Sequence, residues 1–102
     1  MNPANMLAQV KKMQAEMLKA QEELAATIVT GSAAGGAVAI EMTCDHQVKS
    51  VKIAPEAIDP NDVETLEDLI LVATNDALAR VAAESQKRMG AVTGGMRIPG
   101  VV

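Results

Sequence analysis

Hydrophobic residues recur at helical spacing along the first quarter of the chain. They alternate at intervals of four and three residues, which places them on one stripe of a helix over about three heptads. Asn2 can cap the first turn, and Pro3 suits the first helical position because its missing N–H has no partner there. The pattern predicts a long helix to about Ala26, whose stripe needs a partner helix in this chain or in another copy. The stripe consists of Met6, Val10, Met13, Met17, Ala20 and Leu24.

After this helix the pattern changes to the alternation that is typical of strands. Residues 27–30 are mostly β-branched, and apolar residues alternate with other residues over 38–42 and 51–53. This pattern predicts three short strands in an antiparallel meander. Residues 44–47 are expected to form the second connection, although they lack the Asn-Gly pair of a tight hairpin.

Residues 31–36 are expected to form the first connection. Their glycine spacing is similar to that of a phosphate-binding loop, but Ala37 and Val38 stand where lysine and serine or threonine should follow. No predicted helix begins there, so the N–H groups and dipole of a helix N-terminus are also missing. A flexible hairpin loop is the better interpretation.

A second long helix is predicted after the sheet. Pro55 and Pro60 end the strands, Asp59 is the expected N-cap, and Pro60 would occupy the first helical position. Neither glycine nor proline follows until Gly90, which allows about 30 residues, or roughly 45 Å. Such a helix must project beyond a sheet of about 20 Å. Its apolar face consists of Val63, Leu66, Leu69, Ile70, Ala73, Ala77 and Val81.

The chain length fits a single domain. It has 102 residues, of which 49% are hydrophobic and none is Phe, Trp or Tyr, so modules that stack bases on aromatic rings are excluded. We expect one α-β-β-β-α domain over residues 1–93 and a flexible Gly/Pro-rich tail over 94–102. Long apolar stripes on so small a chain predict a homodimer. The single cysteine, and the lack of a membrane-spanning or signal-peptide pattern, predict a soluble intracellular protein.

Candidate catalytic and metal-binding residues are few. Cys44, Asp45 and His46 lie on one short predicted loop. A structural zinc site requires four well-spaced ligands, and this loop offers three. A nucleophile–base pair of Cys44 and His46 would also need a third group to orient the base, and the sequence shows no convincing one. Carboxylates near the start of the second helix, such as Glu64 and Glu67, are explained by the helix dipole. We therefore expect no enzyme activity, cofactor, metal or small-molecule substrate.

Charge is distributed unevenly along the chain, whose net charge is -4. Residues 1–15 carry two lysines and no acid, residues 56–76 carry seven acids and no base, and residues 77–102 carry four bases and one acid. The predicted topology places the acidic segment at the sheet and the basic segments toward the projecting helix ends. Such an arrangement can hold a polyanion. The helix dipole alone would explain Lys87 and Arg88 near a helix C-terminus, but not Lys11 and Lys12.

Two alternative functions can be considered for the residues of the first helix. The methionine stripe can act as an adaptable contact of a helical adaptor that binds a protein partner. A membrane-surface helix is weakly indicated, because Glu16, Glu22 and Glu23 dilute the basic face that anionic lipid needs.

The order of short motifs along the whole chain resembles the YbaB/EbfC family of bacterial nucleoid-associated proteins. The matching segments are 6–14 and 21–24 in the first helix, 29–31 with Gly35-Gly36 in the first hairpin, 66–70, Ala73 and 75–77 in the second helix, and 93–100. Ala54 departs from the Asp that often precedes Pro55. The N-terminus also lacks the Gly/Lys-rich leader of some relatives.

The resemblance implies an α+β fold with a long N-terminal helix, a three-stranded antiparallel meander and a long C-terminal helix, assembled as a tweezer-like homodimer. It further implies a cytoplasmic, nucleoid-associated protein that binds double-stranded DNA, largely without sequence specificity, through its protruding helices. The DNA-binding residues are then Lys11, Lys12, Arg80, Lys87 and Arg88. The dimer or core stripe is Met6, Val10, Met13, Met17, Leu66, Leu69, Ile70 and Ala73.

Overall fold

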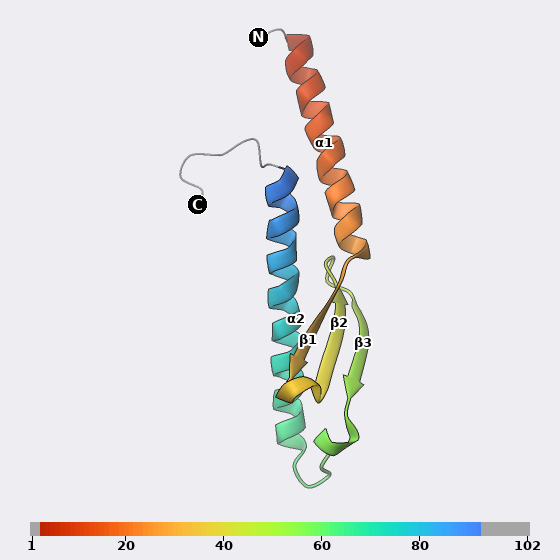
Figure 1. Cartoon of the computed structure of the whole chain (residues 1–102), viewed down its shortest axis with the longest axis vertical. Helices are drawn as coiled ribbons and strands as arrows, with labels where there is room; N and C mark the ends of the chain where they lie inside the picture. Colours follow the sequence, from red (N-terminus) through yellow and green to blue (C-terminus); the bar gives the residue numbers. More distant parts are fainter. Residues whose placement is uncertain (1–2, 93–102) are drawn as a thin grey trace, which may run out of the picture.

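The chain folds into two long helices joined by a three-stranded sheet (Figure 1). A computed structural model describes residues 3–92. The predicted order of elements and the α+β class are confirmed. In chain order they are α1 (Pro3–Ala26), β1 (Ile28–Ala33), the 3-10 turn η1 (Ala34–Gly36), β2 (Val38–Thr43), β3 (Val48–Ile53), the 3-10 turn η2 (Pro55–Ala57) and α2 (Val63–Val92).

The sheet is an antiparallel meander in the order β1-β2-β3. Helix α2 packs on β1 and β2, and β3 lies at the far edge (Figure 1). Alternate residues of β2 point toward α2, which explains the clear strand pattern in the sequence. The core lies between the two layers, and its buried residues include Val38, Ile40 and Met42 of β2 and Ala73, Ala77 and Val81 of α2.

Gly31 lies inside β1, so the prediction that the first connection begins there was wrong. Its backbone crosses α2 so closely that a Cβ at this position would overlap the backbone of Ala73 and lie 2.6 Å from Ala77 Cα. Glycine is thus needed for the contact between strand and helix. The connection itself is the short turn η1, where Gly35 and Gly36 have φ angles of 67° and 98°.

The second connection is the predicted one. The hydroxyl of Thr43 accepts a hydrogen bond from the backbone N–H of Gln47 at 3.1 Å, and the backbone N–H of Thr43 donates to the Gln47 carbonyl at 2.8 Å. His46 takes the left-handed conformation between them, with φ 69°. Strand β3 begins directly after this turn at Val48, three residues earlier than predicted.

Helix α2 begins at Val63, so the prediction of Asp59 as its N-cap and Pro60 as its first residue was wrong. Asp62 is the capping residue: its Oδ1 accepts from the backbone N–H of Thr65 at 3.2 Å, and its Oδ2 accepts from the Thr65 hydroxyl at 2.6 Å. These bonds lower the pKa of the Asp62 carboxyl. Asp59 instead forms a turn, in which its Oδ1 accepts from the N–H of Asn61 at 2.9 Å.

The two helices are as long as the sequence predicts. Helix α1 keeps the predicted bounds, and α2 runs for 30 residues and continues through Gly90. Within the described part of the chain, neither helix has an apolar stretch long enough to cross a membrane. The expected Asn2 cap and the expected tail at 94–102 lie outside the described residues.

The apolar stripe of α1 is buried only where α2 lies beside it. Ala20 and Leu24 are 5% and 6% exposed, whereas Met6 and Val10 remain about half exposed, at 52% and 51%. Figure 1 shows the reason, because the N-terminal part of α1 extends beyond the end of α2. We call this part, residues 3–14, the arm.

Candidate nucleic-acid interface

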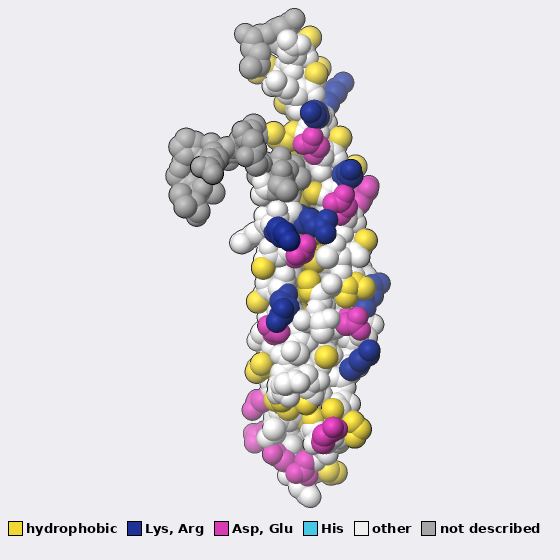
Figure 2. Space-filling model, viewed as in Figure 1, with side chains coloured by type: hydrophobic (Ala, Val, Ile, Leu, Met, Phe, Trp, Pro, Cys, Tyr) yellow, Lys and Arg dark blue, Asp and Glu magenta, His cyan; other side chains and the backbone are white. Residues whose placement is uncertain are grey.

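The two ends of the molecule differ in charge. The acidic segment 56–76 includes the start of α2, at the end of the molecule opposite the arm. Figure 2 shows acidic side chains gathered at that end, whereas the lysine and arginine side chains on this face lie farther along, toward and on the arm. The dipolar charge layout expected from the sequence is therefore present in the fold.

Lys11 and Lys12 project from the arm. Both side chains are exposed, and residues 3–15 of α1 contain no acid. Within the described residues, neither ammonium group has a carboxylate within 4.0 Å. Two unpaired ammonium groups on a projecting helix are well placed for contacts with phosphate.

Arg80 lies on the side of α2 that faces β1. Its Nε is 3.2 Å from Asp76 Oδ2, one turn earlier, and its side chain is 58% exposed. The same Asp76 oxygen accepts from the backbone N–H of Ser32 at 2.9 Å. The Ser32 N–H and the Arg80 guanidinium together hold the pKa of Asp76 below its ordinary range. The Asp76 carboxylate thus accepts the Ser32 N–H on the edge strand β1 and also orients the Arg80 side chain.

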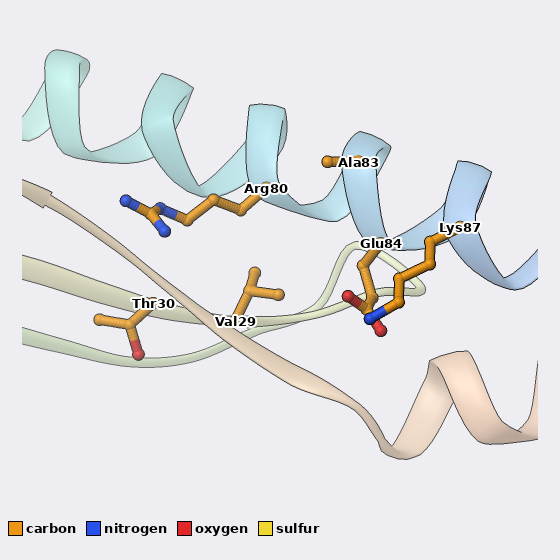
Figure 3. A pocket seen from close by; sticks show the side chains of 6 residues that line it. All are labelled: Val29, Thr30, Arg80, Ala83, Glu84 and Lys87. Carbon is orange, nitrogen blue, oxygen red and sulfur yellow. The ribbon is translucent and has the colours of Figure 1, made fainter.

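Lys87 lies two turns after Arg80 on the same side of α2. The two cations line an open groove of about 370 Å³ between α2 and β1 (Figure 3). Val29 and Thr30 line it from β1, while Ala83 and Glu84 line it from α2. The groove thus has two basic side chains but also one carboxylate, which reduces its attraction for an anion.

Arg88 has a different environment from the other four predicted DNA-binding residues. Its Nη1 is 2.9 Å from Glu23 Oε2 on α1, and its Nε is 3.3 Å from Glu84 Oε1. Its Nη2 donates to the Thr27 hydroxyl at 3.4 Å. These carboxylates raise the pKa of Arg88. The side chain thus joins the last turn of α1 to α2.

Comparison with known proteins gives consistent matches along the chain. The model of the YbaB/EbfC DNA-binding family matches residues 1–96. A nucleoid-associated protein of Chloroflexus aggregans is 46% identical over 97 residues, which cover 95% of this chain and 97% of that protein. A nucleoid-associated protein of Roseiflexus sp. (strain RS-1) is 45% identical over 100 residues, 98% of this chain and 99% of that protein.

The chain belongs to the YbaB/EbfC family. The crystal structure of an uncharacterised Helicobacter pylori protein has the same fold, with a TM-score of 0.72 over 95% of this chain and 99% of that one. Since the two sequences are only 18% identical, this likeness supports the fold alone.

The loop of this YbaB/EbfC protein that holds Cys44, Asp45 and His46 does not assemble their side chains. Cys44 is buried, and its burial, followed by the nearby Glu84 carboxylate, raises the pKa of its thiol. Asp45 accepts a hydrogen bond from the Thr43 hydroxyl, and the His46 side chain is exposed. Among the described residues, no three His, Cys, Asp or Glu side chains converge as metal ligands would.

The acidic partners of Arg80 and Arg88 were not predicted from the sequence. The pairs Asp76–Arg80 and Glu84–Arg88 are both spaced four residues apart on α2, a pattern that is visible in the sequence. The Glu23–Arg88 pair joins residues 65 positions apart and carries no local signal. Because of these pairs, only Lys11, Lys12 and Lys87 of the five predicted residues are without a carboxylate partner within 4.0 Å among the described residues.

Proposed function

We propose that a homodimer of this chain binds double-stranded DNA, mostly without sequence specificity, through basic residues on its protruding helices. The observation that carries the proposal is the position of Lys11 and Lys12 on an arm that lies far from the acidic end of α2. The family description and the nucleoid-associated names of relatives support DNA as the partner. The same names support a place in the cytoplasm, on the nucleoid.

The proposed contacts are with phosphates. Lysine and arginine side chains that neutralise phosphates release condensed counterions, which favours binding to any sequence. Lys87 and Arg80 extend the basic surface along α2, while Arg88 contributes mainly by positioning α1. A dimer with two arms is suited to bend, bridge or compact duplexes, and through this to protect DNA and affect gene expression. No catalytic step is part of this function.

The homodimer is supported by the apolar surface that a single copy leaves uncovered. Met6, Val10 and Met17 of the stripe are 52%, 51% and 38% exposed. Leu66, Leu69 and Ile70 pack against the core and are partly buried. Burial of the exposed part against a second copy would be favourable at roughly 25 cal/mol per Å² of apolar surface.

The same exposed methionines support a second function, that of an adaptor whose arm binds a protein helix. Methionine stripes adapt to varied apolar partners. In that case affinity would depend on Met6 and Met13 and would change little with salt.

Fluorescence anisotropy of a labelled duplex of about 30 base pairs, titrated across a salt series, tests the DNA function. We expect the logarithm of the binding constant to fall with the logarithm of salt concentration, with a slope of about -0.9 per phosphate contact and about four to eight contacts per dimer. Absence of binding at low salt would reject DNA as the partner and favour the adaptor.

A further inference from the structure

We propose that an apolar groove at the acidic end of the molecule binds residues 96–98 of another copy of this chain, so that copies associate end to end. The contact uses neither the arm nor the groove beside Arg80, and it goes beyond the proposed binding of DNA. The evidence comes from the lining of the groove, from the sequence that follows α2, and from the distance between the two.

The groove has a volume of about 320 Å³ and lies between η1, η2 and the first turns of α2. These elements form the end of the molecule opposite the arm (Figure 1). Its apolar lining comes from Ala34, Ala37, Ala57 and Leu69. Because three of these four side chains are single methyl groups, the groove leaves room for a larger apolar side chain from another molecule.

Large apolar side chains are also exposed at this end. Ile58 and Val63 are 54% and 56% exposed, and each directly follows a residue that lines the groove. Figure 2 shows hydrophobic side chains among the acidic ones here. A segment seated in the groove therefore has apolar surface beside it to cover, which is favourable at roughly 25 cal/mol per Å².

Carboxylates stand around the apolar lining. They belong to Glu56, Asp59 and Asp62, and all three side chains are exposed. Within the described residues, no lysine or arginine lies within 4.0 Å of any of them. A groove with apolar walls and unpaired carboxylates favours a segment in which a basic residue stands between apolar ones.

The sequence that follows α2 has this composition. Residues 93–102 contain one base, Arg97, and no acid. Met96 and Ile98 stand on either side of Arg97. In an extended backbone, alternate side chains point to the same side. Met96 and Ile98 would then both enter the groove, and Arg97 would point away from its floor, toward the carboxylates at the rim.

This segment cannot reach the groove of its own copy. Leu69 and Thr65 line the groove 23 and 27 residues before the end of α2 at Val92, which is roughly 35 and 40 Å along the helix. Five residues lead from Val92 to Arg97, and they span at most about 18 Å when fully extended. The occupant must therefore come from another copy.

The contact is heterologous, because it joins the sequence after α2 of one copy to the opposite end of the next. A contact of this kind does not close on itself and can propagate into a row of copies. A homodimer would carry two such segments and two grooves, which strengthens a contact that is weak by itself. Neighbouring copies on one DNA molecule would then hold one another.

Fluorescence anisotropy of a labelled peptide of residues 92–102 measures the contact directly. The protein is the full chain with Arg97→Glu, so that its own segment does not compete. We expect saturable binding that weakens with salt. Binding should fall about tenfold for a peptide with Arg97→Glu, and by a similar factor for one with Met96→Ser and Ile98→Ser. Absence of saturable binding up to about 1 mM protein would reject the groove as the site.

Two variants of the same protein locate the site. Glu56→Lys reverses a charge at the rim and should weaken peptide binding by about tenfold. Glu67→Lys is the matched control, since Glu67 is also exposed and belongs to the same acidic segment but does not line the groove. It should bind the peptide as its parent does. Equal losses in both variants would mean a general attraction to the acidic end and would reject the groove.

Sedimentation velocity of the full chain tests whether the contact joins copies. At high concentration the wild type should form larger species than either Arg97→Glu or Glu56→Lys. An equimolar mixture of the two variants should recover association, because the intact segment of Glu56→Lys can enter the intact groove of Arg97→Glu. Equal sizes for the wild type and both variants would overturn the inference.

These outcomes are distinct from those of the DNA titration. Binding of a duplex without association through the groove would reject this inference and leave the proposed function in place. Association through the groove without binding of a duplex would reject the proposed function and support the end-to-end contact.

Discussion

Arg88 Nη1 on α2 lies 2.9 Å from Glu23 Oε2 on α1, and this pair connects the last third of one helix to the last turns of the other. The guanidinium also contacts Glu84 and Thr27. It lies near the point where α1 passes beyond α2, so it helps to set the direction of the arm. Arg88, which the sequence analysis assigns to DNA binding, thus forms ion pairs within the folded chain.

Arg88→Gln should therefore affect stability more than phosphate binding. We expect a lower melting temperature, because the ion pair that joins α1 to α2 is removed, with an unchanged salt dependence of DNA binding. Lys87→Gln, which removes a charge from the next position, should make the salt dependence less steep by about 0.9 for each phosphate that Lys87 neutralises in the wild type. An equal decrease of slope in both variants would show that Arg88 leaves its carboxylates to bind DNA.

Neutralising the arm should weaken DNA binding. The double variant Lys11→Gln/Lys12→Gln removes two charges per copy, and we expect a lower affinity at low salt and a less steep salt dependence. Lys52→Glu changes the net charge by the same amount on a strand far from the arm. Anisotropy titrations of both proteins check the prediction, and equal losses of affinity would mean that only net charge matters.

Gly31→Ala should destabilise the protein by about 3 kcal/mol, because the added Cβ overlaps backbone atoms of α2 that cannot move without separating helix and sheet. Gly90→Ala is the matched control. Among the described residues, no atom outside the adjoining backbone of α2 lies within 4 Å of a Cβ at Gly90, and alanine in a helix should stabilise by about 0.5–1 kcal/mol. Urea denaturation at one fixed protein concentration measures both effects. A stable Gly31→Ala variant would show that β1 does not lie this close to α2.

The contribution of Asp76 to stability should depend on pH. Its pKa is lowered in the folded protein by the Ser32 N–H and Arg80, so the ionised carboxylate stabilises the fold above the ordinary aspartate pKa of about 3.9. This stabilisation is lost as the pH falls through the lowered pKa. Asp76→Asn should melt below the wild type at pH 7, and the gap should close in the acid range below about pH 4.

Melting curves of both proteins from pH 7 to pH 3 provide the measurement. Glu22→Gln, which removes one carboxylate from an exposed position on α1, should follow the wild type throughout. A gap between Asp76→Asn and the wild type that stays constant down to pH 3 would contradict a role for the ionised carboxylate.

Local patterns in the sequence were sufficient to predict the elements. The heptad spacing predicted α1 with its observed bounds, and alternation predicted three strands, because helix and strand periodicities follow from backbone geometry. The predicted start of α2 was wrong because two neighbouring segments carry similar local signals. Asp59-Pro60 and Asp62 both have the composition of a helix start, and only the hydrogen bonds to Thr65 distinguish them.

Gly31 shows why the remaining details required the fold. In the sequence it belongs to a glycine-rich run and was assigned to a loop, whereas in the structure it is the point at which β1 meets α2. The same holds for Arg88, whose partner Glu23 is 65 residues away. Neither contact has a local signature, because each depends on how two distant segments pack.

The sequence by itself determined the order of helices and strands, the separation of acidic from basic segments and the resemblance to a DNA-binding family, since these depend on residue type and short-range spacing. Only the tertiary structure decided which cations are paired, that α1 extends beyond α2, and that neither of these two helices covers β3. These properties depend on how long-range packing distributes burial and distance. Burial and distance in turn determine whether a charged or apolar side chain meets water, a neighbouring side chain or a partner molecule.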